Sequence, residues 1–199
     1  MLKIITVTFD FGISTMYETL HDVLIYSIEK YCPAAEWVSN TLDEPPLNGQ
    51  IRGFVTNTIK LAKWVEELHL CNKGDQVVFL DCDMLVLGDL GGAFSKSWDV
   101  GYTVRTDCRF PINGGAIFVN VNERSLYFFD KFLEINNYLL ANPAIHRIYR
   151  DKYAGMNQAA FGYILENHKD EFAKLKALPC STWNVCDHYE EALKNGAKI

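Results

Sequence analysis

Two acidic residues that follow an apolar run are the residues of this chain best suited to chemistry. Four consecutive apolar residues, Val77–Leu80, lead directly into Asp81-Cys82-Asp83. An apolar run of this length is typical of a strand that is buried on both faces of an α/β sheet. We predict that the strand continues to Val86. Because side chains alternate along a strand, Asp81 and Asp83 would then point to the same side, with their Cα atoms roughly 6.6 Å apart.

Two carboxylates at the end of a buried strand predict a metal site. Ligands of open α/β sheets bind beyond the carboxyl ends of the strands, and Mg²⁺ and Mn²⁺ prefer oxygen ligands. We therefore expect Asp81 and Asp83 to hold Mn²⁺ or Mg²⁺, with substrate phosphates completing the coordination shell. The alternative is that both acids simply end the strand. It is disfavoured because a buried strand rarely delivers two unpaired carboxylates to one face.

Two classes of enzyme use such a pair of acids. In a phosphohydrolase of the haloacid dehalogenase type, an Asp-x-Asp after a hydrophobic strand supplies the nucleophile and the general acid. In a glycosyltransferase, the two acids hold a metal ion on the pyrophosphate of a nucleotide sugar. The phosphohydrolase pattern normally follows the first strand and opens with Gly-Thr. Here Met84-Leu85 follows the acids, and a strand and two helical segments precede them, so glycosyl transfer is the preferred hypothesis.

The composition limits the domain count and the partners. The chain has 199 residues, of which 49% are hydrophobic and 22% charged, as expected for a single globular domain. Its formal net charge of −6 has the wrong sign for a surface that binds nucleic acid. No apolar run approaches the roughly 20 residues that span a bilayer. The first apolar run is short and leads into Asp10, unlike a signal peptide.

The six cysteines are scattered and form no CxxC pair; they are Cys32, Cys71, Cys82, Cys108, Cys180 and Cys186. Without an export signal, we expect reduced thiols and a cytoplasmic location rather than disulfides. A zinc site is not expected, because the Cys180/Cys186 spacing lacks a second pair.

Apolar periodicity predicts the elements that position the acids. Strands are expected at Leu2–Phe9, Asp99–Val104 and Ala116–Val121, and helices after a Thr15/Glu18 capping box, at Thr56–Leu70, Asn122–Leu140 and Asn157–Glu166. Loops or turns are expected at Asn40–Gly49 and at Phe110–Gly115, and the C-terminus looks polar. Strand, loop and helix in that order begin a βαβ unit of an α/β protein.

Several short motifs occur in an order that resembles the family-8 glycosyltransferases and their GT-A-fold relatives, glycogenin among them. The motifs are Thr8-Phe9-Asp10, Tyr17, Ser27, Lys60-Leu61, Asp81-Cys82-Asp83 and Ile112-Asn113-Gly114-Gly115-Ala116. The resemblance covers about Ile4 to Asn184. It implies a GT-A-like (Rossmann-like) α/β fold with a mixed, mostly parallel central sheet flanked by helices. Residues 1–199 would form one nucleotide-sugar transferase domain.

The resemblance also implies an activity. It implies a metal-dependent hexosyltransferase that moves a hexose from a UDP-sugar-like donor to a hydroxyl group of a glycan, protein or small-molecule acceptor, with retention. The donor would be bound by Thr8, Phe9, Asp10 and Tyr17 around the base and ribose, by Lys60, Asp81, Cys82 and Asp83 at the phosphates, and by Asn113, Gly114 and Gly115 at the sugar. Glycines let the backbone approach a ligand, and Asn offers an amide donor and acceptor. Asn113-Gly114 is also compatible with a plain turn into a strand.

Asn157-Gln158 resembles the Asp-Gln pair that lies near the donor sugar in family-8 enzymes. Both residues are therefore candidate catalytic residues. Because Asn157 replaces the acid, a carboxylate role at this position is lost. The Gln158 amide oxygen remains able to bind the sugar or its developing positive charge. The competing interpretation of Asn157 is a helix N-cap.

The chain departs from the family pattern at its C-terminus. Family members carry a His-x-x-Gly-x-x-Lys segment that supplies a third metal ligand and a lysine to the diphosphate. This sequence ends at Lys198-Ile199, and the context of His188 does not match. Three explanations stay open: a truncated chain, a segment from a partner, or weakened binding that leaves a nucleotide-sugar-binding domain without transfer.

Two further segments have two interpretations each. Arg147–Tyr153 combines cations with two tyrosines and suits either an acceptor groove or an exposed polar loop. Trp183, in a segment that resembles the late Leu-Pro…Asn of the family, suits either stacking on a sugar or packing in the core.

Overall fold

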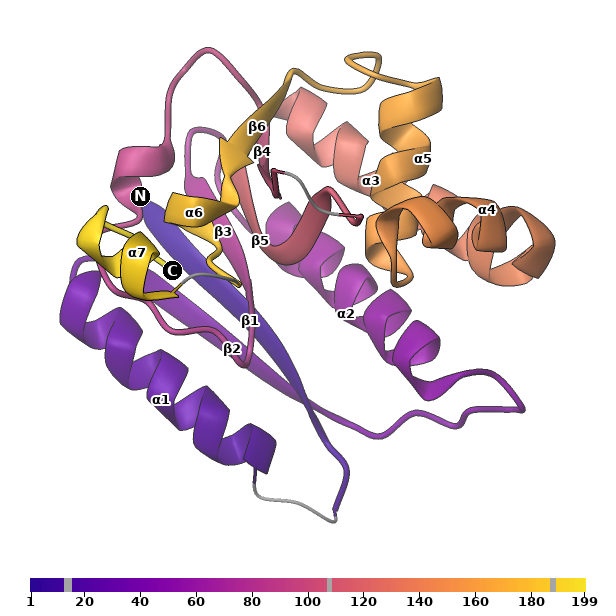
Figure 1. Cartoon of the computed structure of the whole chain (residues 1–199), viewed down its shortest axis with the longest axis horizontal. Helices are drawn as coiled ribbons and strands as arrows, with labels where there is room; N and C mark the ends of the chain where they lie inside the picture. Colours follow the sequence, from indigo (N-terminus) through magenta and orange to yellow (C-terminus); the bar gives the residue numbers. More distant parts are fainter. Residues whose placement is uncertain (13–15, 107–108, 187–188) are drawn as a thin grey trace.

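A six-stranded sheet with the strand order β2-β1-β3-β5-β4-β6 forms the middle of the molecule (Figure 1). The computed structural model describes residues 1–12, 16–106, 109–186 and 189–199. Its strands are β1 (Leu2–Asp10), β2 (Glu36–Asp43), β3 (Gln76–Asp81), β4 (Val100–Val104), β5 (Ile112–Asn120) and β6 (Leu175–Pro179). The pairs β1–β2, β1–β3 and β4–β6 are parallel, and β5 runs antiparallel to both of its neighbours. The predicted mixed, mostly parallel sheet is confirmed.

Helices cover both faces of this sheet. They are α1 (Met16–Tyr31), α2 (Arg52–His69), α3 (Glu123–Ala141), α4 (Pro143–Tyr153), α5 (Asn157–Asn167), α6 (Cys180–Trp183) and α7 (Tyr189–Lys194), with a 3₁₀ turn η1 at Gly91–Ala93. Figure 1 shows α1 on one side of the sheet and α2, α3 and α5 on the other. None of the helices that the structure describes is long and apolar enough to cross a membrane.

The alternation of β3 side chains explains the two layers of the core. Val77 and Phe79 belong to the cluster beneath α2, α3 and α5, whereas Val78 and Leu80 belong to the cluster beneath α1. All four side chains are fully buried. In the first cluster, the Phe79 ring stacks on Trp64 of α2 with a centroid distance of 4.9 Å. Between Gln76 and Asp81, the strand is thus apolar on both faces, as predicted, and its acidic side chain is at its carboxyl end.

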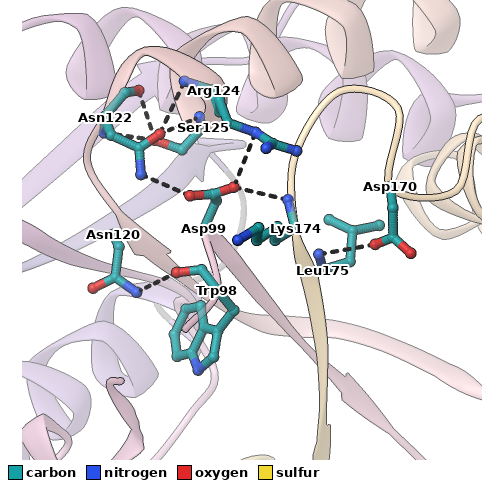
Figure 2. A network of polar contacts seen from close by, with 9 residues as sticks. All are labelled: Trp98, Asp99, Asn120, Asn122, Arg124, Ser125, Asp170, Lys174 and Leu175. Carbon is teal, nitrogen blue, oxygen red and sulfur yellow. Dashed lines mark hydrogen bonds and ion pairs between the residues drawn. The ribbon is translucent and has the colours of Figure 1, made fainter. Parts of the chain in front are cut away.

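A polar network around Asp99 lies at the end of the sheet where β4 begins (Figure 2). The Asp99 carboxylate accepts hydrogen bonds from Lys174 N (2.8 Å) and Asn122 Nδ2 (2.9 Å), and it pairs with the Arg124 guanidinium (3.3 Å). Asn122 caps α3 by accepting from Arg124 N and Ser125 N. One carboxylate therefore joins the starts of β4, β6 and α3.

Three predicted loop or turn segments are regular elements in the structure. Residues 40–43, predicted as loop, complete the edge strand β2, and α2 begins at Arg52 rather than at Thr56. Arg147–Tyr153, predicted as an exposed loop or a groove, lies in α4. The predicted turn before Ala116 is wrong, because β5 already begins at Ile112.

The predicted central strand is too long, and the C-terminus is less polar than expected. β3 ends at Asp81, and Cys82 and Asp83 lie in a turn. Ala197 and Ile199 are buried, and Lys198 O accepts a hydrogen bond from Leu87 N at 2.8 Å.

Some predictions fall on positions that the structure leaves undescribed. Thr15, Cys108 and His188 lie outside the described residues. Of the cysteines within them, Cys32, Cys71, Cys82 and Cys180 are free thiols.

Candidate active site

An open cleft of about 220 Å³ lies at the carboxyl ends of β1 and β3. We call it the acidic cleft. It is lined by Val7, Thr8, Phe9, Phe11, Tyr17, Thr56, Asn57, Lys60, Asp81, Cys82 and Asp83. Both acids of the Asp-x-Asp motif thus face the same solvent-accessible space. Ligands of α/β proteins bind at this carboxyl end of parallel strands.

A turn, and not strand alternation, brings the two acids to one cleft. Asp81 is the last residue of β3, and Met84 N donates to Asp81 O at 3.3 Å, which closes a turn over Asp83. The segment after the turn is held by buried Ser27 of α1, whose hydroxyl accepts a hydrogen bond from Val86 N at 3.0 Å. Ser27, a member of the resemblance motifs, therefore positions the backbone behind the acids.

Lys60 of α2 is bonded to the first acid. Its Nζ lies 2.5 Å from Asp81 Oδ1 and 4.9 Å from the ring centroid of Trp64, one helical turn further along α2. The side chains of Lys60 and Asp81 are 13% and 31% exposed. The cleft therefore holds its own positive charge beside two negative ones.

Three aromatic rings form one wall of the cleft. Phe9 and Phe11 stack with a centroid distance of 6.1 Å, and the Tyr17 ring meets Phe11 edge-on at 5.9 Å. Asp10 is not among the lining residues, and its carboxylate accepts a hydrogen bond from Gly12 N at 2.7 Å. The rings present flat apolar surface beside the acids, whereas Asp10 shapes the loop that follows β1.

Cys82 lies between the acids as a neutral thiol. Burial raises its pKa, and this effect outweighs the hydrogen bond with Thr8, which lowers it. The neighbouring Asp83 and Asp81 carboxylates raise the pKa further. Because only a thiolate is a strong nucleophile or metal ligand, Cys82 adds neither role to the cleft at neutral pH.

A second, smaller space of about 10 Å³ lies between β5, α2 and α5. We call it the amide cavity. It is lined by Trp64, Tyr102, Ile112, Asn113, Gly114, Ile117, Phe132, Asn157, Gln158 and Phe161. Neither the Asn157 amide nitrogen and oxygen nor Trp64 Nε1 has a hydrogen-bond partner in the described part of the chain, although all three atoms are buried. Buried polar atoms are normally paired, so these three mark the cavity as a place where a ligand group or water completes the bonding.

The N-cap interpretation of Asn157 is wrong. The N-cap position of α5 is Met156, and Asn157 is the first helical residue, with an exposed fraction of 9%. Its side chain is turned inward, where it lines the amide cavity.

Gln158 is fixed by its amide nitrogen. Nε2 donates to Ile112 O at 2.6 Å and to Tyr153 O at 3.1 Å. A Cβ on Gly114 would lie 3.2 Å from Gln158 Cγ, so the glycine allows the side chain to cross β5 closely. These two bonds orient the amide group. They do not use the amide oxygen, which can accept a hydrogen bond from a ligand.

The second glycine of the Asn-Gly-Gly motif makes room for Asn184. A Cβ on Gly115 would lie 3.3 Å from Asn184 Nδ2 and Oδ1. Asn184 is buried, and its Nδ2 donates to Thr103 Oγ1 at 2.9 Å. Asn113 O accepts from the same Thr103 hydroxyl at 2.7 Å. The motif is thus a strand segment that is bonded to its neighbours, and Gly115 lines neither the acidic cleft nor the amide cavity.

Trp183 packs in the core on the α1 side of the sheet. Its ring meets Phe118 edge-on with a centroid distance of 5.7 Å. Of its two interpretations, the structure supports packing.

The acidic cleft fits a divalent cation whose coordination shell is completed by ligand oxygens. Two carboxylates supply hard oxygen donors, which is the number Mg²⁺ commonly takes from a protein before phosphates and water complete its shell. Within the described residues, no group of three or more His, Cys, Asp or Glu side chains forms a complete metal site. A third protein ligand, which the resemblance implies, has no counterpart there.

Except for Asp10 and Gly115, the predicted site residues divide between the two spaces. Thr8, Phe9, Tyr17, Lys60, Asp81, Cys82 and Asp83 line the acidic cleft, and Asn113, Gly114, Asn157 and Gln158 line the amide cavity. Trp64, four residues after Lys60 on α2, connects them. Sequence reasoning missed Phe11, Thr56, Asn57 and Trp64. Thr56 and Asn57 precede Lys60 by four and three residues, so helical spacing places all three on one face.

Comparison with solved structures shows which known proteins share this fold. No protein-family model and no curated protein sequence matches the chain. A glycosyltransferase involved in glycosylation of the major capsid of PBCV-1 has a TM-score of 0.61 and 15% identity over 98% of this chain and 91% of its own. The galactosyltransferase LgtC, solved with donor and acceptor sugar analogs, has a TM-score of 0.54 and 13% identity over 99% and 84%.

Two further comparisons agree with these. The glycosyltransferase GlyE of Streptococcus pneumoniae TIGR4 has a TM-score of 0.57 and 12% identity over 97% of this chain and 50% of its own. An LgtC variant in which an active-site glutamine is replaced by glutamate has a TM-score of 0.53 and 13% identity over 99% and 84%. The expected GT-A-like α/β fold is confirmed, and it is the fold of solved glycosyltransferases.

Proposed function

We propose that this protein is a glycosyltransferase that moves a hexose from a UDP-sugar-like donor to a hydroxyl group of an acceptor. The observation that carries the proposal is the acidic cleft, which brings Asp81 and Asp83 together beside aromatic rings at the carboxyl ends of two parallel strands. The fold shared with solved glycosyltransferases supports the same assignment.

The aromatic wall suits the nucleotide. Phe9, Phe11 and Tyr17 offer ring faces and edges in the cleft, and stacking of a base on an aromatic side chain contributes about 1–3 kcal/mol. Thr8 and Asp10 belong to the same strand end as Phe9. We assign the base and ribose to this part of the cleft, with the diphosphate towards the acids.

Asp81 and Asp83 would hold Mn²⁺ or Mg²⁺ against the diphosphate. The chemistry that such an ion supplies when bound is Lewis-acid stabilisation of the negative charge on the leaving nucleotide diphosphate. Lys60 is the cation of this chain that lines the cleft, and it adds a positive charge at the same place.

The amide cavity would face the donor sugar. Its lining contains the amides of Asn113, Asn157 and Gln158 and no carboxylate. The described cavity residues therefore offer no carboxylate nucleophile for a covalent glycosyl intermediate. Gln158, oriented by its two backbone acceptors, would place its amide oxygen near the anomeric carbon. Retention of configuration, which the family resemblance implies, would then depend on leaving-group departure rather than on a strong nucleophile.

Two other functions remain as outcomes of the test. A phosphohydrolase that uses Asp81 and Asp83 would release phosphate from a simple phosphomonoester. A nucleotide-sugar-binding domain would bind UDP with the cation but transfer nothing.

The test is incubation of the protein with UDP- and GDP-sugars and Mn²⁺, with p-nitrophenyl phosphate in parallel. We expect slow release of UDP and free hexose from one UDP-sugar, and faster UDP release when a suitable hydroxyl acceptor is added. An Asp81→Asn variant controls for contaminating activity. Release of phosphate from p-nitrophenyl phosphate without any UDP release would contradict the proposal, and UDP binding without release from any donor would favour the binding domain.

A further inference from the structure

The ion pair between Lys60 and Asp81 occupies the place where the cation is expected. Lys60 Nζ contacts Asp81 Oδ1 at 2.5 Å and lies 4.9 Å from the Trp64 ring centroid. The lysine side chain is largely buried, with an exposed fraction of 13%. The ammonium group is therefore held by a carboxylate and an aromatic face, and both attract a cation.

This pairing changes the charge that the cleft offers to a metal ion. Of the residues that line the acidic cleft, Asp81 and Asp83 are negative and Lys60 is positive. While Lys60 is bound to Asp81, only Asp83 has no counter-charge within the lining. An incoming divalent cation meets one available carboxylate and a positive charge beside it, and like charges repel.

A diphosphate would reverse this balance. Its oxygens offer Lys60 an alternative anionic partner and offer the cation additional ligands. The lysine stem has four rotatable bonds and lets the ammonium group move between two acceptors that line the same cleft. The nucleotide and the cation would then each strengthen the binding of the other.

We propose that Lys60 is an internal cation that occupies Asp81 in the ligand-free protein and moves to the donor diphosphate when the nucleotide binds, which frees Asp81 for the divalent cation. Lys60 is thereby a positioning residue that keeps the metal site closed until the nucleotide arrives. This inference rests on the proposed function for the identity of the ligand. The exchange at Asp81 itself depends only on the ion pair and the two carboxylates.

The test compares the affinity for Mn²⁺ alone in the wild type and in Lys60→Met, with free Mn²⁺ measured by electron paramagnetic resonance. We expect Lys60→Met to bind Mn²⁺ more tightly by about tenfold, within the usual range for two coupled sites. Calorimetry with UDP in the absence of metal should show the opposite change, a weaker affinity, because the phosphate loses its lysine. The two changes of opposite sign distinguish exchange from a loss of folding.

Lys63 provides a matched control on the same helix. It pairs with Glu66 (3.1 Å) and Glu67 (3.2 Å) and does not line the cleft. Lys63→Met removes the same charge from the protein, but outside the cleft. We expect it to leave Mn²⁺ affinity within about twofold of the wild type, because exposed charges interact weakly in water. Lys60→Arg keeps the charge and should keep Mn²⁺ binding weak, and Asp83→Asn combined with Lys60→Met should abolish the gained affinity.

Several results would overturn the exchange. Equal or weaker Mn²⁺ binding in Lys60→Met would show that Lys60 merely supports Asp81, and absence of Mn²⁺ binding in both proteins would show that no cation site lies beneath the lysine. If Lys60→Met binds Mn²⁺ more tightly but no protein binds UDP, the exchange holds and the proposed function fails. Thermal unfolding of each variant shows whether it is folded during the measurement.

Discussion

At the residue scale, Asn157 holds a buried amide group whose position is not explained by hydrogen bonds within the described chain. Its amide nitrogen and oxygen and Trp64 Nε1 are buried without hydrogen-bond partners among the described residues. Each such atom costs about 1–3 kcal/mol when it is left unpaired. The amide cavity of about 10 Å³ has room for roughly one water molecule or one hydroxyl group. The proposed function accounts for this side chain if a hydroxyl group of the donor sugar binds it.

The substitution Asn157→Leu tests this interpretation. Leucine has a similar volume and removes two unpaired polar atoms, so we expect the free energy of unfolding to stay equal or to rise by about 1 kcal/mol. Release of UDP from the donor should fall at least about tenfold, because the sugar loses a polar contact. Denaturant unfolding and the donor assay measure the two effects.

Asn184→Leu is the control for Asn157→Leu. Asn184 is also buried, but its Nδ2 donates to Thr103 Oγ1 at 2.9 Å. Loss of that bond should destabilise the protein by about 1–3 kcal/mol. A similar loss in Asn157→Leu would show that buried water already satisfies the Asn157 amide, and would contradict the account.

At the scale of elements, the contact between α4 and α5 depends on one glycine. A Cβ on Gly162 of α5 would overlap the ring of Tyr153 at the end of α4. The Tyr153 hydroxyl donates to Glu166 at 2.9 Å. Burial, followed by the Glu166 carboxylate, raises the pKa of Tyr153 to about 12, so this hydroxyl stays protonated. The same tyrosine supplies a carbonyl acceptor to Gln158, which links this packing to the site.

Alanine substitutions of two helical glycines should have opposite effects. Gly162→Ala should lower the free energy of unfolding by about 1–3 kcal/mol, because the Tyr153 ring must move. Gly53→Ala in α2 should raise it by about 0.5 kcal/mol, because nothing lies within 4 Å of the added Cβ and alanine favours a helix. Guanidinium unfolding measures both, and a neutral Gly162→Ala would contradict the packing described.

Sequence patterns predicted some of the helices and strands but not others. β3 was predictable because its residues are apolar on both faces. β2 was missed because it lies at the edge of the sheet and most of its side chains are partly or fully exposed, so no apolar run marks it. α4 was missed although Pro143 occupies its first turn, a position that proline favours. Pro143 also lies two residues after the end of α3, where a proline equally marks the end of a helix.

At the scale of the whole molecule, the site depends on pairing between distant strands. Leu80 of β3 lies opposite Ala116 of β5. This antiparallel register brings Asn113–Gly115 to the same end of the sheet as Asp81, the last residue of β3. Local sequence patterns identified each motif but not this pairing, so the division into an acidic cleft and an amide cavity was not predictable. Nor was the Lys60–Asp81 ion pair, which joins α2 to β3.

The overall charge makes the cation central to the account. The protein has a formal net charge of −6, and the proposed donor carries a negative diphosphate. Lys60 alone among the residues that line the cleft is positive. Under the proposed function, a divalent ion held by Asp81 and Asp83 would supply the further positive charge that strengthens binding of the diphosphate.

The most direct test is calorimetric titration of UDP into the wild type and into Asp83→Asn, each with and without Mn²⁺. We expect Mn²⁺ to raise the UDP affinity of the wild type by about tenfold or more, and we expect this gain to disappear in Asp83→Asn while the ligand-free melting temperature stays unchanged. A gain from Mn²⁺ that is the same in both proteins would show that Asp83 does not hold the cation, and would contradict the proposed cation site.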